Sequence, residues 1–361
     1  TMQLRTLLAL VVGITTLIAL VVLSGVFSAG LNDYRSETAE QAVRVRATTL
    51  GTMLERSLHE EWRNVELAAA AITSVADRQA LQDRIDAMGA TNEKVSWIGI
   101  AAPDGTVLAS TRGMLVGENV GQRDWFQQGL TGPFAGDVHD ALLLARLMQP
   151  EASDPLRFVD FSAPVLDASG NVIAVLGAHV NWQWVRGIVD EAAQLLELDA
   201  IVVNREGTII LSTAVIDESV AQVNSLQAAR RGVAGVFEET WPDGVRYQVF
   251  TVPNLTYGSM PPFGWSLVAR LDPAALAGPQ QRFQTRFGLA AIAAWALVLA
   301  AFVFVAGILI MPLRRISSAL LAQARGQPVT YVREHRRFKE VQVLSEVLAR
   351  LQSGGRDAPP R

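Results

Sequence analysis

Cysteine is absent from the 361-residue sequence, and this absence excludes several kinds of chemistry. A chain without thiols forms no disulfides, no thiolate metal sites and no cysteine nucleophile. Histidine is scarce, with four residues, and only 18% of the residues are charged while half are hydrophobic. That balance is too apolar for an ordinary soluble domain. The sequence also contains no phosphate-binding glycine loop, nucleophile elbow or zinc-protease helix motif, so no enzymatic activity is expected.

Two long runs without a charged residue account for most of the apolar excess. They cover residues 7–29 and 287–313. A helix rises about 1.5 Å per residue, so each run is long enough to cross a bilayer. Arg314 and Arg315 follow the second run at once, and Arg5 precedes the first. Because cytoplasmic segments carry the excess of Lys and Arg, both ends of the chain are predicted to be cytoplasmic.

This orientation predicts a protein of the bacterial inner membrane with two spans. Residues 1–6 would be cytoplasmic and residues 30–286 exported. The rival interpretation of residues 1–29 is a cleaved signal peptide, which the long apolar run and the poor cleavage site disfavour. The basic segment after the second span indicates contact with membrane lipid, and no nucleic-acid partner is expected.

Apolar residues recur at steps of three or four over residues 32–76, which predicts one long helix. A helix of this length does not fit inside a compact domain. It is therefore expected to form a stalk that continues the first span and packs against a second copy of the chain. A shorter helix is predicted over residues 78–88, and the two helices together make up a segment at 30–89.

A hairpin pattern then occurs twice. An apolar strand, an acidic-Gly turn and a second strand ending in Ser-Thr begin at Val95 and again at Ala200. Each copy closes with further strands, over residues 158–180 in the first and 235–271 in the second. The repetition indicates an internal duplication.

A helix predicted over residues 183–198 separates the copies, so the fold class is α+β with two sheet modules, at 90–185 and 186–272. After the second span, residues 314–352 contain two amphipathic segments. Neither can bury its apolar stripe alone, which predicts a parallel dimer of helical hairpins. The Gly/Pro-rich residues 353–361 are expected to be disordered.

Residues 121–129 place a guanidinium, an indole and a phenyl ring within four positions, at Arg123, Trp125 and Phe126. An Arg fork beside an indole N–H suits a planar anion such as a carboxylate. The rings would exclude water and supply stacking area. The alternative is that Arg123 pairs with Asp124 on the surface and that the aromatic residues belong to the core.

Two sheet modules behind one long helix, bracketed by two spans, resemble the double Cache (tandem PAS-like) sensor domains of bacterial transmembrane receptors. The resemblance covers residues 31–272. Residues 312–352 resemble a HAMP signalling unit, with Pro312 and Glu340 at positions typical of such units. The resemblance implies a homodimeric sensory receptor that binds a small molecule in its first module. The output domain, of kinase, diguanylate cyclase or chemotaxis type, would lie beyond residue 361 or in a cytoplasmic signalling partner.

In the amino-acid-binding branch of that family, an Arg-x-Trp-Tyr run holds the ligand carboxylate. The resemblance assigns this role to Arg123 and Trp125, with Phe126 in place of Tyr. An acidic residue in the last strand of the same module holds the ligand ammonium, and His179 takes that position here. The resemblance therefore implies a carboxylate-bearing anion and not an ordinary α-amino acid.

Further polar residues follow Arg123 and Trp125, which together are called the carboxylate clamp. Asp137 and His139 share a face if their segment is extended, and with His179 they could form a metal site or the centre of an exported hydrolase. A hydrogen-bonding loop pair or direct ligand contact is favoured, so no metal or cofactor is expected. Arg157 and Asp160 should face opposite sides of their strand. A scaffold with a vacant pocket is the third alternative. The predicted ligand site comprises Arg123, Trp125, Phe126, Asp137, His139, Arg157, Asp160, His179, Asn181 and Trp182.

Overall fold

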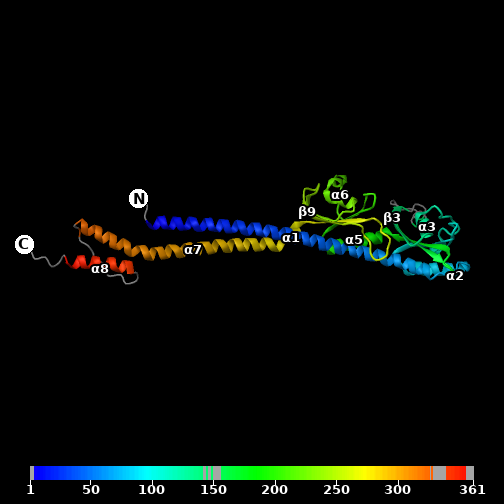
Figure 1. Cartoon of the computed structure of the whole chain (residues 1–361), viewed down its shortest axis with the longest axis horizontal. Coiled ribbons are helices and arrows are strands. Elements are labelled where there is room, and N and C mark those ends of the chain that lie inside the picture. The colour runs from blue at the N-terminus through cyan, green and yellow to red at the C-terminus, as the bar shows by residue number, and fades with distance from the viewer. Residues whose placement is uncertain are drawn as a thin grey trace, which may run out of the picture. The chain divides into compact units, whose positions relative to one another are not determined.

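The computed structural model describes residues 4–140, 144, 148, 156–325, 327 and 339–354 (Figure 1). The chain divides into two compact units. Tyr34–Gly278 contains both sheets and is called the sheet unit. Thr1–Asp33 together with Pro279–Arg361 forms the helical unit. The predicted α+β class with two antiparallel sheets behind a long helix is confirmed.

Two long helices carry the apolar runs, α1 (Leu4–Ala70) and α7 (Pro273–Ala324). Each is long and apolar enough to cross a membrane, with a mean hydropathy of 2.6 in the first and 2.8 in the second. Within the helical unit, Phe27 stacks on Phe287 with ring centroids 4.2 Å apart. The first apolar run continues without a break into the predicted stalk, as expected. The helix ends at Ala70, however, six residues before the predicted end.

A third helix of the helical unit, α8 (Lys339–Gly354), contains the predicted second amphipathic segment. It includes Ser353 and Gly354, the first two residues of the segment that is expected to be disordered. Residues 355–361 lie outside the described residues, as does most of the connection between α7 and α8. The HAMP-like hairpin therefore stays a prediction.

The first sheet has five antiparallel strands in the order β2-β1-β5-β4-β3. The strands are β1 (Val95–Ala101), β2 (Val107–Ser110), β3 (Phe134–Asp140), β4 (Arg157–Leu166) and β5 (Val172–Asn181). The hairpin predicted from Val95 onward is confirmed as β1 and β2. The strand pair predicted over residues 158–180 is confirmed as β4 and β5. Strand β3 was not predicted as a strand, because its polar Asp-Val-His-Asp sequence reads as a loop.

The second sheet repeats this order as β7-β6-β10-β9-β8. Its strands are β6 (Asp199–Val203), β7 (Ile209–Ser212), β8 (Gly235–Thr240), β9 (Arg246–Val252) and β10 (Ser266–Leu271). Shorter helices complete both modules. They are α2 (Arg78–Thr91), α3 (Asp124–Gly129), α5 (Trp182–Leu195), α6 (Asn224–Arg230) and the 3-10 turns η1 (Thr111–Gly113) and η2 (Glu218–Gln222).

The duplication extends to single hydrogen bonds. In the first module the hydroxyl of Thr111 accepts a bond from the backbone N–H of Ile98 at 3.0 Å. In the second module the hydroxyl of Thr213 accepts the same bond from Ala200 at 2.9 Å. The repeated Ser-Thr of the sequence therefore marks the place where each hairpin is tied back onto its first strand.

The apolar stripe of α1 is buried by the chain's own sheets. Helix α1 runs alongside both sheets (Figure 1). Leu50, Leu54 and Leu58 are at most 1% exposed and belong to one core cluster with residues of both sheets. A methyl group on Gly51 would lie 3.4 Å from the Leu255 side chain of the second module. The prediction that this stripe packs against a second copy is wrong. A 3.6-residue period indicates that one face of a helix is buried, but it does not indicate which segment covers that face.

Separate clusters cover the opposite face of each sheet. Helix α3 and the segment before it cover the first sheet, through Trp125, Phe126 and Val120. Helix α6 covers the second sheet, mainly through Leu226 and Ala229. Each sheet thus separates a face packed on α1 or α5 from a face covered by short segments.

Candidate ligand-binding site

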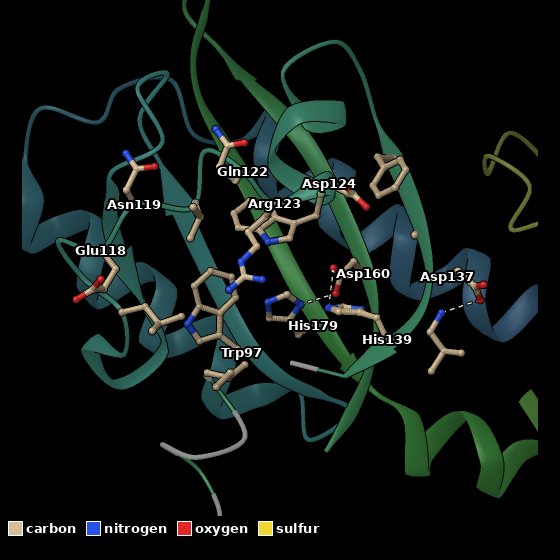
Figure 2. A pocket seen from close by; sticks show the side chains of 17 residues that line it. Trp97, Glu118, Asn119, Gln122, Arg123, Asp124, Asp137, His139, Asp160 and His179 are labelled. Atoms are coloured by element: carbon tan, nitrogen blue, oxygen red, sulfur yellow. Dashed lines mark hydrogen bonds and ion pairs between the residues drawn. The ribbon is translucent and has the colours of Figure 1, made fainter. Parts of the chain in front are cut away.

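A cavity of about 350 Å³ lies on the face of the first sheet that α3 covers (Figure 2). Side chains from β1, β3, β4 and β5 form its floor, and residues 118–120 and 122–124 form part of its rim. This volume is within the usual range for sites that hold small molecules. Of the ten residues predicted from sequence, six line the cavity: Arg123, Trp125, Asp137, His139, Asp160 and His179.

A row of three side chains crosses the floor of the cavity. The strand register pairs Trp97 of β1 with His179 of β5, and His179 with Asp160 of β4. Directly paired residues on antiparallel neighbours point to the same face. The ring of His179 stacks on that of Trp97, with centroids 5.0 Å apart. Trp97 was not predicted as a site residue, because an aromatic residue in an apolar strand reads as core.

A bulge in β3 brings His139 to the same face. Gly136 pairs with Asp160 and His139 pairs with Phe158, so three steps on β3 match two steps on β4. The extra residue shifts the alternation of side chains. Gly136 and His139 therefore both face the cavity, and Asp137 turns away. The prediction that Asp137 and His139 share a face is wrong, because it assumed regular alternation.

The carboxylate of Asp137 binds the second module instead. One oxygen accepts a hydrogen bond from the Trp265 indole N–H at 2.6 Å, and the other accepts one from the Asn204 amide at 3.0 Å. Figure 2 shows this carboxylate turned away from both histidines. Asp137 borders the cavity, but its charged group ties the cavity wall to the neighbouring sheet.

The two cavity histidines meet at one carboxylate. Nδ1 of His179 hydrogen-bonds to one oxygen of Asp160, and Nε2 of His139 lies 3.5 Å from the other oxygen (Figure 2). The side chains of Asp160 and His179 are 9% and 8% exposed, and that of His139 is 41% exposed. A buried carboxylate needs such partners, because leaving water without them is costly.

Arg123 and Trp125 occupy different environments, although they are two residues apart. Arg123 precedes the first turn of α3 and is exposed. Among the described residues it forms no ion pair, so the alternative pairing with Asp124 is not found there. Trp125 is buried, and its ring lies where a methyl group on Gly177 would come within 2.5 Å. The glycine of β5 therefore makes room for the indole that walls the cavity.

Four predicted residues do not line the cavity. Phe126 is buried in the cluster beneath α3. Arg157 lies on the opposite face of β4 and pairs with Asp140 at 3.4 Å, which confirms that it and Asp160 point to different sides. Asn181 caps α5 through a 2.8 Å bond from the backbone N–H of Gln183. Trp182 packs edge-on against Trp265, with centroids 5.7 Å apart.

At the position of the second module that matches His179, the described residues place an ion-paired arginine. By strand register Arg270 of β10 corresponds to His179 of β5. The Arg270 guanidinium pairs with Asp199 at 2.8 Å and with Asp243 at 3.3 Å, and it packs on the rings of Trp241 and Tyr247. The position of the cavity is therefore occupied by the Arg270 side chain in the second module and is open in the first.

No family model matches the sequence, and comparison with curated proteins gave no match. Among solved structures, the ligand-binding domain of the Pseudomonas aeruginosa PAO1 amino acid chemoreceptor PctB, in complex with L-Arg, has a TM-score of 0.51 and 13% identity. The match covers 72% of this chain and 98% of that one. The ligand-binding domain of Campylobacter jejuni chemoreceptor Tlp3, in complex with L-norvaline, has a TM-score of 0.51 and 13% identity, over 68% and 95% of the two chains.

A third match is an extracellular ligand binding receptor from Desulfohalobium retbaense DSM5692, with a TM-score of 0.49 and 13% identity. That match covers 63% of this chain and 40% of the receptor chain. At these identities, a TM-score above 0.5 shows a shared fold. The sheet unit has the fold of the ligand-binding domains of the chemoreceptors PctB and Tlp3.

Proposed function

We propose that this chain is a transmembrane sensory receptor that binds a small carboxylate-bearing ligand in the cavity of its first module. The observation that carries the proposal is the exposed Arg123 guanidinium, which has no ion pair among the described residues and lines a cavity of about 350 Å³. An Arg fork is suited to paired hydrogen bonds with a carboxylate. Trp97 and Trp125 supply apolar walls beside it.

The ligand class follows from the charges around the cavity. Arg123 offers a cationic group at the rim, whereas both oxygens of Asp160 face imidazoles. Both oxygens of Asp160 thus already have imidazole partners, and neither is free to bind a ligand ammonium. This favours a carboxylate without an α-amino group. The similar domains of PctB and Tlp3 are described with L-Arg and L-norvaline, so amino acids are the main competing class.

A thermal-shift and calorimetric screen of the purified chain tests this function. The panel contains monocarboxylates, dicarboxylates, matched L-amino acids and neutral analogues of each. Binding to the native state stabilises it, so a carboxylate at 100 times its Kd should add about 2.7 kcal/mol. Stabilisation by carboxylates alone supports the proposal, and stabilisation by amino acids would correct the ligand class. A response only to neutral analogues would contradict it.

The two apolar helices support an arrangement in which the sheet unit is exported and the signal crosses the membrane through α7. Differential affinity of the ligand for two states of the receptor suffices for such signalling. A parallel homodimer remains part of the proposal, now supported only by the amphipathic segments that follow the second span. No catalytic activity is proposed for this chain.

Topology is the next prediction. The basic residues after the second apolar run indicate that both ends of the chain are cytoplasmic. Compartment-sensitive reporters fused after residue 200 and after residue 355 should therefore give opposite signals. A cleaved first run would be seen as a shortened mature chain. Equal signals from both fusions would rule out the two-span arrangement.

A further inference from the structure

Three potential metal ligands converge in the cavity of the first module. His139, Asp160 and His179 each offer one ligand atom, and these atoms all lie within 4.8 Å of one another. The residues come from three neighbouring strands, β3, β4 and β5. Two of the four histidines in the sequence thus meet at a single carboxylate. The sequence-based metal alternative had Asp137 as its carboxylate, and Asp160 takes that place in the structure.

The donor types select a class of metal ion. Two imidazole nitrogens and one carboxylate oxygen suit Zn²⁺, Ni²⁺, Co²⁺, Fe²⁺ or Cu²⁺. Ca²⁺ takes six to eight oxygen ligands, so this set does not suit it. Thiolates cannot compete for the ion, because the chain has no cysteine.

The three ligand atoms lie near one another but are more widely spaced than around a bound ion. With metal–ligand bonds of about 2.0–2.2 Å, ligand atoms in a tetrahedral site lie about 3.4 Å apart. Nε2 of His139 lies 3.5 Å from Oδ2 of Asp160, and Nδ1 of His179 is hydrogen-bonded to Oδ1 of the same carboxylate. Ligand atoms that lie within 4.8 Å of one another would have to draw together around an ion, and the 41% exposure of His139 leaves that side chain room to move.

The rest of the site is held in place. The Asp160 and His179 side chains are 9% and 8% exposed and sit on adjacent strands. The rings of Trp97 and Phe158 pack on His179 with centroids 5.0 Å and 5.6 Å away. Asp160 and His179 are held in place while His139 has room to move, which suits a site that binds and releases an ion.

Asp160 is the residue on which the proposed ligands converge. Asp160 is a nearly buried carboxylate, and its ion pairs among the described residues are those with the two histidines. A divalent ion bound there would take the place of the hydrogen bond between His179 and Asp160, and its binding would release any proton held on the ligating nitrogens.

We infer that His139, Asp160 and His179 bind one divalent transition-metal ion on the floor of the cavity. Three protein ligands leave at least one coordination position open to the cavity. Arg123 lines the same cavity, so a carboxylate can bind the ion and the guanidinium together. This last step rests on the proposed function, whereas the metal site itself stands on the three ligands alone.

The test uses the whole 361-residue chain in detergent, purified with a tag that contains no histidine and treated with a chelator. Co²⁺ is added while its visible absorption is recorded, and Zn²⁺ binding is then measured by calorimetry. We expect one Co²⁺ per chain, with the intense absorption of a four- or five-coordinate ion, displaced by Zn²⁺. Binding without saturation, or with no change in the Co²⁺ spectrum, would overturn the inference.

Variants assign the site. His139→Ala removes a half-exposed ligand and should weaken Zn²⁺ binding at least about 100-fold, beyond the 10–100-fold typical of losing a supporting contact. Asp160→Asn should have a similar effect. His59→Ala is the matched control, because His59 packs beside Tyr257 and does not line the cavity. Equal Zn²⁺ affinity in His139→Ala and His59→Ala would contradict the assignment.

The same measurements separate this inference from the proposed function. Carboxylate binding that persists in chelator and in His139→Ala would remove the metal from ligand recognition while leaving the receptor proposal intact. Stoichiometric Zn²⁺ binding without any carboxylate response would support the metal site and contradict the carboxylate clamp.

Discussion

Replacing Arg123 by alanine is expected to weaken binding of the best carboxylate ligand by one to several powers of ten. A hydrogen bond to a charged group contributes about 1.5–3 kcal/mol, and each 1.4 kcal/mol corresponds to a factor of about ten in Kd. The guanidinium lines the cavity and has no competing ion pair among the described residues, so the substitution breaks no ion pair in that part of the chain. Calorimetry with the native and substituted chains measures the change in Kd.

Two further variants sharpen this result. Arg123→Lys should recover only part of the affinity, because an ammonium cannot reproduce the two parallel N–H bonds of the fork. Arg157→Ala is the matched control, since it removes the same charge from an arginine that pairs with Asp140 on the opposite face of β4. It should leave Kd nearly unchanged. An unchanged Kd in Arg123→Ala, or a best ligand without a negative group, would show that the clamp is misassigned.

Replacing Trp265 by alanine is expected to lower the free energy of unfolding by about 3–5 kcal/mol, as is typical for a large aromatic residue in a core. Trp265 is fully buried and stacks on Phe263, with ring centroids 4.5 Å apart. It also packs edge-on against Trp182, and its indole N–H donates to Asp137 at 2.6 Å. The side chain therefore joins the cavity wall of the first module to the core of the second.

Trp265→Phe separates the two contributions of this residue. The phenyl ring keeps most of the apolar contact and removes the indole N–H, so Asp137 keeps the Asn204 bond and loses a partner. The expected loss is about 1–3 kcal/mol. Denaturant unfolding of the sheet unit gives both values, and both modules should unfold in one transition. A loss below about 1 kcal/mol for Trp265→Ala would mean that the core closes over the space left by the indole, and two separate transitions would mean that the modules unfold independently.

Local patterns of the sequence determined the elements of this protein. The uncharged runs predicted both long apolar helices, and the repeated hairpins at Val95 and Ala200 predicted two similar sheets. The position of Arg123 at the cavity was also predicted, because a short Arg-aromatic run keeps its residues close wherever the chain folds. Such features depend on the 3.6-residue and two-residue periods of side chains, which are properties of neighbouring positions.

Only the tertiary structure decided what these elements contact. The stripe of α1 packs on the chain's own sheets, which no helical period can distinguish from packing on a second copy. A bulge in β3 turns the Asp137 side chain toward the second module and the His139 side chain toward Asp160. The register between β4 and β5 places His179 beside Asp160 as well. Bulges and register arise from pairing between strands far apart in sequence, and one extra residue reverses which side chains reach the cavity.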